Sequence, residues 1–251
     1  MMKSEITKIS NFALYYLNLP DLKNIISMNN IVLHIPHSSS KMIYDGWDNI
    51  SELRKHIQKW TDFDTDKLFL PSHCYNIPIN SVVGEYSRFT VDFERLPENE
   101  PLEKIGQGII YTKYGNCVRV LNSKLTKFLL SIYEQHYKKL RSLLNANSLL
   151  IDCHSFPDEL SDDVDICIGF NDDWSKPDEN LLNTIISVFE SRSYVVGLNT
   201  PYSNSVSPKM NFEYKSVMIE VNKRIYMNNL LDFKRLSETI YTLYSKLERL
   251  Q

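Results

Sequence analysis

The sequence predicts an α/β fold with a central, mostly parallel or mixed β-sheet flanked by helices. Short apolar segments alternate along the chain with longer amphipathic ones, which is the pattern of strands covered by helices. Several short segments are apolar at nearly every position, as expected of strands buried on both faces. The chain has 251 residues, 43% of them hydrophobic, which is enough apolar material for one sizeable core. We therefore expect residues 1–251 to form a single domain.

Six short segments have the composition of β-strands, rich in β-branched and other apolar residues. In chain order they are 31–35, 76–80, 148–153, 165–170, 193–197 and 216–221. Pro36 directly follows the first segment, and because proline has no amide hydrogen it ends the strand pairing there. The next residue, His37, is therefore expected to lie in a loop at the end of the first strand.

Two longer segments have the three-to-four-residue apolar spacing of amphipathic helices. In the first, the spaced positions are Val118, Leu121, Leu125, Leu129, Ile132, His136, Leu140 and Leu143. In the second, they are Leu236, Ile240, Leu243, Leu247 and Leu250. Glycine is scarce, with 7 residues in the chain, and a glycine-rich phosphate loop is missing from the pattern.

Charge and composition exclude several classes of function. The net charge of -3 is spread without long runs of one sign, so the principal partner is not expected to be a nucleic acid. No stretch approaches the ~18 consecutive apolar residues of a membrane span, and the start of the chain lacks the order of a secretion signal. We expect a cytoplasmic protein without a membrane partner. The cysteines are predicted to be free thiols because they form no C-x-x-C pair. They are Cys74, Cys117, Cys153 and Cys167.

Ionisable residues lie at or near the ends of three predicted strands. His37 follows the first strand, Asp152 and His154 end the segment "SLLIDCH", and Glu220 lies in the apolar segment "SVMIEV". Ligands of open α/β sheets bind beyond the carboxyl ends of the strands, and an unpaired carboxylate inside an apolar strand is costly. These residues are therefore expected to form one site.

Two histidines from separate strands, together with a carboxylate, match the ligand set of a catalytic zinc. The segment 59–69 offers Asp62, Asp64 and Asp66 at a predicted helix start. Their spacing does not choose among them, and acidic residues at that position commonly only cap a helix. His34 lies three residues before His37 and so on the opposite face of a strand, which makes His37 the better ligand.

The remaining residues near this site are assigned as follows. Asp152 and His154 are two positions apart and face the same way. Asp152 therefore either orients a zinc-bound histidine through a hydrogen bond or merely caps a strand end. His136 lies on the apolar stripe of the long helix, where a packed and hydrogen-bonded histidine is the commoner case. His56 and His73 are likewise placed outside the site.

Six ordered motifs resemble the N-formylglutamate amidohydrolase family, zinc hydrolases with a fold like that of zinc carboxypeptidases. They are "HIPHSS", "TDFDTDKLF", "SRFTVDFER", "DCHSFPD", "NTPY" and "IEVNKRIYM", and they extend over residues 31–227. The resemblance implies that one divalent metal ion, zinc, is bound by His37, Asp62 and His154. It also implies that Glu220 is the general base. The arginines of two motifs would hold substrate charge: Arg88, Arg95 and Arg224.

The implied reaction is hydrolysis of the amide bond of an N-acyl (N-formyl) amino acid or of a short peptide. A zinc ion polarises the carbonyl and lowers the pKa of water toward ~7. Glu220 would take the proton of that water and pass it to the leaving amine. The planar fork of an arginine suits a substrate carboxylate. Two histidines and a carboxylate also suit iron, cobalt or manganese.

Three departures from the family pattern concern substrate handling. Ser39 replaces a usual glycine, Glu94 replaces a usual asparagine, and the 199–211 segment lacks glycines. These changes keep two alternatives open. One is a binding protein of the same fold without catalytic activity, and the other is a hydrolase of cell-wall peptides or esters. Metal content separates enzyme from binder, and a screen of acyl amino acids and cell-wall peptides separates the two hydrolases.

Overall fold

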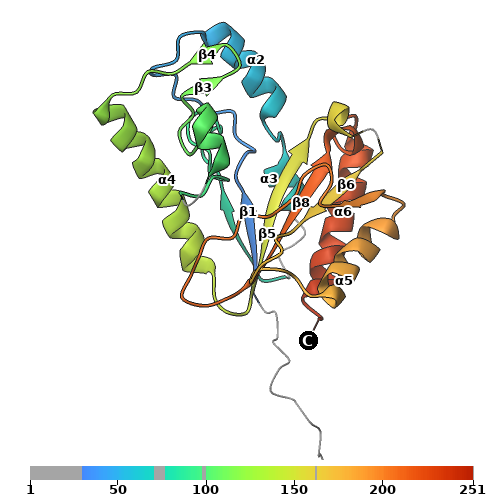
Figure 1. Ribbon diagram of the computed structural model, residues 1–251. Helices are drawn as coiled ribbons and strands as arrows, with labels where there is room; N and C mark the ends of the chain where they lie inside the picture. Colours follow the sequence, from blue (N-terminus) through green and yellow to red (C-terminus); the bar gives the residue numbers. More distant parts are fainter. Residues whose placement is uncertain (1–29, 71–76, 98–99, 162, 251) are drawn as a thin grey trace, which may run out of the picture.

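A six-stranded sheet forms the centre of the molecule (Figure 1). The structure is a computed structural model, and it describes residues 30–70, 77–97, 100–161 and 163–250. The strands are β1 (Asn30–Ile35), β2 (Ile79–Val83), β5 (Ser148–Phe156), β6 (Ile166–Gly169), β7 (Val196–Leu198) and β8 (Lys215–Asn222). Their spatial order is β2-β1-β5-β8-β6-β7. All neighbouring strands are parallel except β6 and β8, which are antiparallel. The sheet is therefore mixed, and the predicted fold class is confirmed.

Helices cover both faces of this sheet (Figure 1). One face carries α4 (Ser123–Leu143); the other carries α3 (Thr65–Phe69), α5 (Glu179–Glu190) and α6 (Leu230–Leu247). A smaller part contains α2 (Ile50–Trp60) and the ribbon of β3 (Lys113–Tyr114) and β4 (Cys117–Val118). Three short 3₁₀ helices lie in the connections: η3 (Pro101–Ile105), η4 (Asp158–Leu160) and η5 (Lys223–Ile225).

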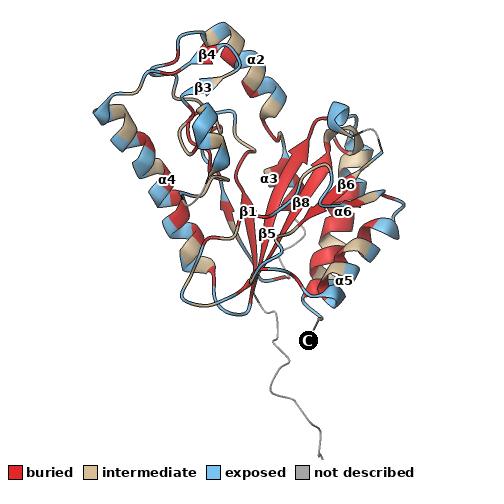
Figure 2. Cartoon of the chain, viewed as in Figure 1, coloured by how far each residue is buried: buried red, intermediate tan, exposed pale blue. Residues whose placement is uncertain are grey.

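Successive side chains of the central strands pack into two separate cores. On β1, Leu33 belongs to the core under α5 and α6, whereas its neighbour Val32 belongs to the core under α4. On β5, Ile151 and Leu150 divide in the same way. This follows from the two-residue period of a strand. Figure 2 shows the central strands buried along their length, and all nine residues of β5 are buried.

The long amphipathic helix begins later than its apolar spacing suggests. Val118 lies in β4 and is 43% exposed, so it does not belong to the stripe. The side chain of Asn122 accepts a hydrogen bond from the amide of Leu125 and caps α4, which satisfies one of the free amides of its first turn. Similarly, α6 ends at Leu247, so Leu250 lies beyond the helix.

The second predicted strand is displaced along the chain, because β2 spans Ile79–Val83 and not 76–80. Its register pairs Ile31 with Ile79 and Ile35 with Val83. The predicted features that involve 1–29, His73 and Cys74 lie outside the described residues.

Three cysteines confirm the expectation of free thiols: Cys117, Cys153 and Cys167 are buried and unpaired. Cys153 packs in the core between the sheet and α6, on the opposite face from Asp152 and His154. None of the helices in the described part of the chain is long and apolar enough to cross a membrane.

The parallel strands β1, β5 and β8 bring their carboxyl ends to one edge of the sheet. The register of β5 and β8 places His154 directly beside Glu220. In the loop after β1, the carbonyl of His37 accepts a hydrogen bond of 2.9 Å from the amide of Asp62. This bond ties the chain after α2 to the end of β1, so residues from four separated segments meet at this edge.

Candidate metal centre

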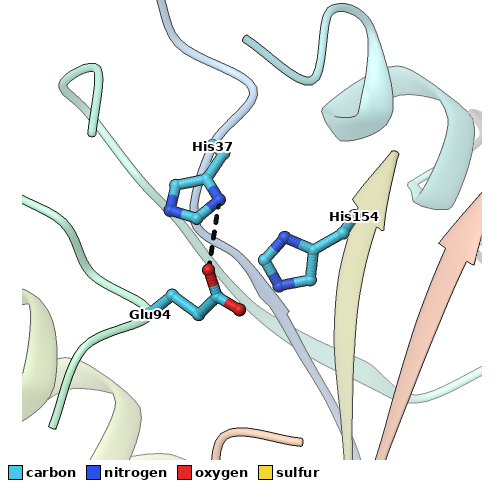
Figure 3. Close-up of side chains that lie close together, drawn as sticks. All are labelled: His37, Glu94 and His154. Carbon is cyan, nitrogen blue, oxygen red and sulfur yellow. Dashed lines mark ion pairs between the residues drawn. The ribbon is translucent and has the colours of Figure 1, made fainter. Parts of the chain in front are cut away.

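Two histidines and two carboxylates converge at the carboxyl edge of the sheet. Potential ligand atoms of His37, Glu94 and His154 lie within 4.8 Å of one another (Figure 3). The carboxylate of Asp62 joins them, with Oδ2 at 3.3 Å from Nδ1 of His154 and 3.8 Å from Nδ1 of His37. The structure thus brings together the three ligands expected from the sequence and adds Glu94.

His37 is held so that one ring nitrogen faces the centre of this cluster. Its Nε2 lies 2.8 Å from Oδ1 of Asp92, and its Nδ1 lies 2.5 Å from Nη2 of Arg88. Since a guanidinium can only donate, Nδ1 is the accepting nitrogen and Nε2 carries the proton. Asp92 is itself fixed, because Tyr111 donates to its Oδ2 at 2.7 Å and the amide of Glu94 to its Oδ1 at 3.0 Å.

His154 is placed in a similar way between two carboxylates. Its Nδ1 faces Asp62, and its Nε2 lies 3.1 Å from Oδ1 of Asp152. Although this distance is short, the buried Nε2 makes no well-aligned hydrogen bond within the described residues. Asp152 is completely buried, and this arrangement matches the orienting partner predicted for a metal-bound histidine.

The charges of the cluster favour a cation. Burial lowers the pKa of His37, assisted by Arg88, so this histidine is neutral and able to act as a ligand. Burial also disfavours a charge on His154, but the carboxylates of Asp152, Glu94 and Asp62 raise its pKa well above the usual value. Burial alone would raise the pKa of Asp62, yet His154 and Arg88 lower it. A carboxylate environment that retains a proton on a buried imidazole also stabilises a metal ion in its place.

The residues fit a divalent metal ion. Arg88 already places a cation among the same atoms, at 2.5 Å from Nδ1 of His37 and 3.8 Å from Oδ2 of Asp62. The two imidazoles and the two carboxylates are the donors that zinc and related metals bind. The carboxylates of Asp92 and Asp152 lie behind the imidazoles, as partners that orient metal-bound histidines do.

Glu220 faces this cluster from β8. Its side chain is 7% exposed, and its Oε2 has no hydrogen-bond partner in the described part of the chain. Burial raises the pKa of its carboxyl to about 8, although His154 opposes the shift. The ion pair with Lys223 that would make Glu220 structural is not formed, since the ammonium of Lys223 donates to the carbonyls of Lys59 and Thr61.

A pH dependence of stability follows for the metal-free protein. Between the ordinary value of 4.5 and about 8, the folded protein keeps a proton on Glu220 that the unfolded chain has released. The free energy of unfolding should therefore decrease as pH rises through this window. Glu220→Gln removes that contribution, so in thermal melts after chelation the variant should gain stability over the wild type from pH 5 to pH 8. A constant difference in Tm across these pH values would contradict the raised pKa.

An enclosed cavity of about 250 Å³ lies beside the cluster. Asp62, Arg88, Glu94 and Glu220 line it, together with Met218, the neighbour of Glu220 on the same face of β8. A second cavity of about 570 Å³ shares Glu94, Arg95, Leu102, Ser203 and Met218 with the first. The centre therefore opens toward a larger polar cleft.

The three arginines expected to hold substrate charge occupy different positions. Arg88 and Arg95 line the cavity, and Nε of Arg95 lies 3.3 Å from Oδ2 of Asp92. Arg224 is not among the lining residues. Its guanidinium instead pairs with Asp158 at 2.9 Å and Asp165 at 3.0 Å, which are structural ion pairs.

The substituted positions of the family pattern are accommodated locally. Ser39 does not adopt positive φ, and its hydroxyl donates to the carbonyl of Glu85 at 2.8 Å. In the glycine-poor segment, Asn199 and Asn204 have φ values of 51° and 72°. Asparagine enters this left-handed region more readily than other residues with side chains, so these residues serve where glycine would be the usual choice.

Two residues of the site were not assigned to it from the sequence. Asp92 lies in the motif "SRFTVDFER", but nothing in its spacing connects it to His37, which is 55 residues away. Glu94 was interpreted only as a change in substrate binding, yet its carboxylate lies 3.9 Å from Nδ1 of His37. The signal that could have found them is the spacing of Asp92 and Glu94, two acidic residues on either side of Phe93.

Comparisons with known proteins agree with this architecture. The family model described as N-formylglutamate amidohydrolase matches residues 29–227. The crystal structure of N-formylglutamate amidohydrolase from Ralstonia eutropha is similar, with a TM-score of 0.71 and 14% identity over 87% of this chain and 92% of that one. A gene product of Agrobacterium tumefaciens has a TM-score of 0.63 and 16% identity over 90% and 92%. At these identities the likeness shows the fold. A search among curated proteins found no match.

Proposed function

The chain belongs to the N-formylglutamate amidohydrolase family, and from this membership we propose that it is a metal-dependent hydrolase. Its reaction is cleavage of the amide bond of an N-acyl amino acid, with N-formyl amino acids as the first candidates, or of a short peptide. The observation that supports this best is the convergence of His37, His154 and Asp62. Asp62 and Glu220 line one cavity, and Oε2 of Glu220 has no hydrogen-bond partner among the described residues.

In this proposal, one metal ion per chain is held by His37, Asp62 and His154, and zinc is the first candidate for that ion. Glu94 is a further carboxylate in reach of the same centre. A metal ion held there would polarise the substrate carbonyl and make water acidic enough to react near neutral pH. Asp92 and Asp152 keep the imidazole protons on the far side of each ring, so that the ligand nitrogens face inward.

Glu220 is the proposed general base. As water adds to the acyl carbon, Glu220 accepts one of its protons and then delivers that proton to the nitrogen of the breaking C–N bond. Its Oε2 has no hydrogen-bond partner in the part of the chain that the structure describes, so it is available for this role. Burial strengthens the carboxylate as a base because it disfavours the charged form.

Arg88 and Arg95 are the proposed binders of substrate carboxylate because both line the cavity. Formylglutamate carries two carboxylates, and the acidic residues Asp62, Glu94 and Glu220 share that cavity. The adjoining cleft of about 570 Å³ also exceeds what a formyl group needs. These features leave room for a longer acyl or peptide part and keep cell-wall peptides and esters as the alternative.

Arg95→Lys should reduce kcat/KM about tenfold for an N-acyl amino acid with a free carboxylate, because lysine cannot form the two parallel bonds of a guanidinium. The C-terminally amidated form of the same substrate should lose much less. Arg88→Lys should show the same preference. Arg224→Lys is the control, and its ion pairs with Asp158 and Asp165 lead us to expect equal changes on both substrates. Equal losses for Arg95→Lys would remove that arginine from substrate recognition.

A panel of N-formyl and longer N-acyl amino acids, cell-wall peptides and esters tests the proposed reaction. The wild type loaded with zinc should release free amine from at least one amide of the panel. Binding of these compounds without release of amine would favour the binding protein of the same fold.

We further infer that residues 1–251 form one domain of this family. The cytoplasmic location remains a prediction from the sequence.

A further inference from the structure

A chain of buried polar side chains lies behind the metal centre, on the face of the sheet that α4 covers. His34 on β1 and Asp152 on β5 are 0% exposed, and His136 on α4 is 8% exposed. His34 and His136 are not among the residues that line the two cavities of the site. Since buried polar groups are costly unless hydrogen-bonded, their position needs an explanation.

The contacts form a continuous sequence from α4 to the metal centre. Nε2 of His136 lies 2.9 Å from Nε2 of His34, and Nδ1 of His34 lies 2.8 Å from Oδ1 of Asp152. The same oxygen lies 3.1 Å from Nε2 of His154. The amide of Val206 donates to the other oxygen of Asp152 at 3.2 Å, so this carboxylate is held from three sides.

One arrangement of protons satisfies the contacts among His136, His34 and Asp152. Asp152 accepts from the amide of Val206 at Oδ2, and its Oδ1 accepts from Nδ1 of His34. The imidazole of His34 thus donates from Nδ1, and its other nitrogen, Nε2, is left to accept. His136 must supply the proton for that contact. Burial lowers the pKa of His136 to about 2, so His136 is neutral and donates from Nε2.

His136 also packs against the segment behind the other metal-binding histidine. Its ring stacks on Phe93, with centroids 4.1 Å apart and an interplanar angle of 17°. Phe93 lies between Asp92, which contacts His37, and Glu94. The imidazole of His136 is thus fixed in the plane that its contact with His34 requires.

We propose that His34 and His136 are positioning residues that orient the carboxylate of Asp152 and thereby keep the proton of His154 on Nε2, leaving Nδ1 for the metal. The inference rests on the proposed function, because it assigns a role relative to a bound metal. His34 determines the direction of the Asp152 carboxylate, and His136 determines the ring orientation of His34. Residues that orient metal ligands in this way contribute typically ~10–100-fold to metal affinity.

Two variants of His34 separate positioning from simple packing. The amide nitrogen of His34→Asn takes the place of Nδ1 and can still donate to Asp152. His34→Gln places its amide near the position of Nε2 and loses that donor. The zinc Kd of each folded protein is measured at one pH by competition with a chelator, beside His136→Phe. The control is His56→Asn, because His56 contacts Phe89 and Tyr114 and lies outside the chain of contacts.

We expect His34→Gln to weaken zinc binding about 10- to 100-fold and His34→Asn to recover most of that loss. His136→Phe should weaken it less, and His56→Asn should match the wild type. Equal zinc affinity of His34→Gln and the wild type, with only a lower Tm, would show that the histidines merely pack and would overturn this inference alone. A wild type that binds no zinc would overturn the proposed function as well.

Discussion

Replacing Glu220 by glutamine should lower kcat at least ~100-fold while the metal and the fold stay in place. Glutamine keeps the size of the side chain but cannot accept the proton of water. The side chain is 7% exposed and its Oε2 has no hydrogen-bond partner among the described residues, so its removal breaks no observed contact of that oxygen. Metal content, Tm and kcat are measured on the same preparation with a substrate that the wild type hydrolyses.

Glu85→Gln provides the control, because Glu85 is an exposed acid that pairs with Lys41. It should leave kcat and metal content unchanged. A Glu220→Gln protein with lower Tm but nearly normal kcat per folded molecule would show that the carboxylate is structural. That result would withdraw the catalytic assignment and favour a binding protein.

His154→Ala should lose both bound metal and hydrolysis. The imidazole of His154 lies between Asp62 and Asp152, and alanine removes a proposed ligand as well as the partner of two buried carboxylates. The loss in affinity should exceed the ~10–100-fold that removal of an orienting residue causes. Elemental analysis of the variant and the wild type, purified in parallel, measures the effect.

His56→Ala is the matched control for that experiment. His56 is a partly exposed histidine of α2 whose nearest acid is Glu52, at 3.9 Å, and its loss should leave the metal content at the wild-type value. Equal metal in His154→Ala and the wild type would show that the two histidines and their carboxylates are not the metal site.

The sheet and the edge that carries the site could be predicted from the sequence. Strands buried on both faces leave nearly continuous apolar runs, and polar residues at their ends stand out against these runs. His37, His154 and Glu220 are therefore visible without any knowledge of the fold. The choice of Asp62 from three aspartates required the family resemblance, and its place beside His154 agrees with that choice.

Asp152 was predicted behind His154, but the other partners behind the histidines were not, because they are distant in the sequence. His34 contacts both Asp152, which is 118 residues away in the sequence, and His136, which is 102 residues away. His136 keeps the helical spacing of an apolar stripe, so the pattern alone indicates only a buried position. Its hydrogen-bond partner depends on how α4 packs against β1, which no local spacing encodes.

The position of Arg224 likewise depends on local geometry that the motif does not reveal. The side chain of Asn222 accepts a hydrogen bond of 3.0 Å from the amide of Arg224 and caps η5. The chain turns there, and the guanidinium reaches Asp158 and Asp165. A residue four positions after Glu220 is therefore not carried into the cavity.

The most direct test of the central claim is a metal titration of the chelated protein. Zinc is returned stepwise to the metal-free enzyme, and bound metal and the rate of amide hydrolysis are measured at each step. The account predicts negligible hydrolysis without metal and a rate that rises in proportion to bound zinc until one ion per chain is bound. Full activity of the chelated protein, or saturation with zinc without any gain in rate, would contradict it.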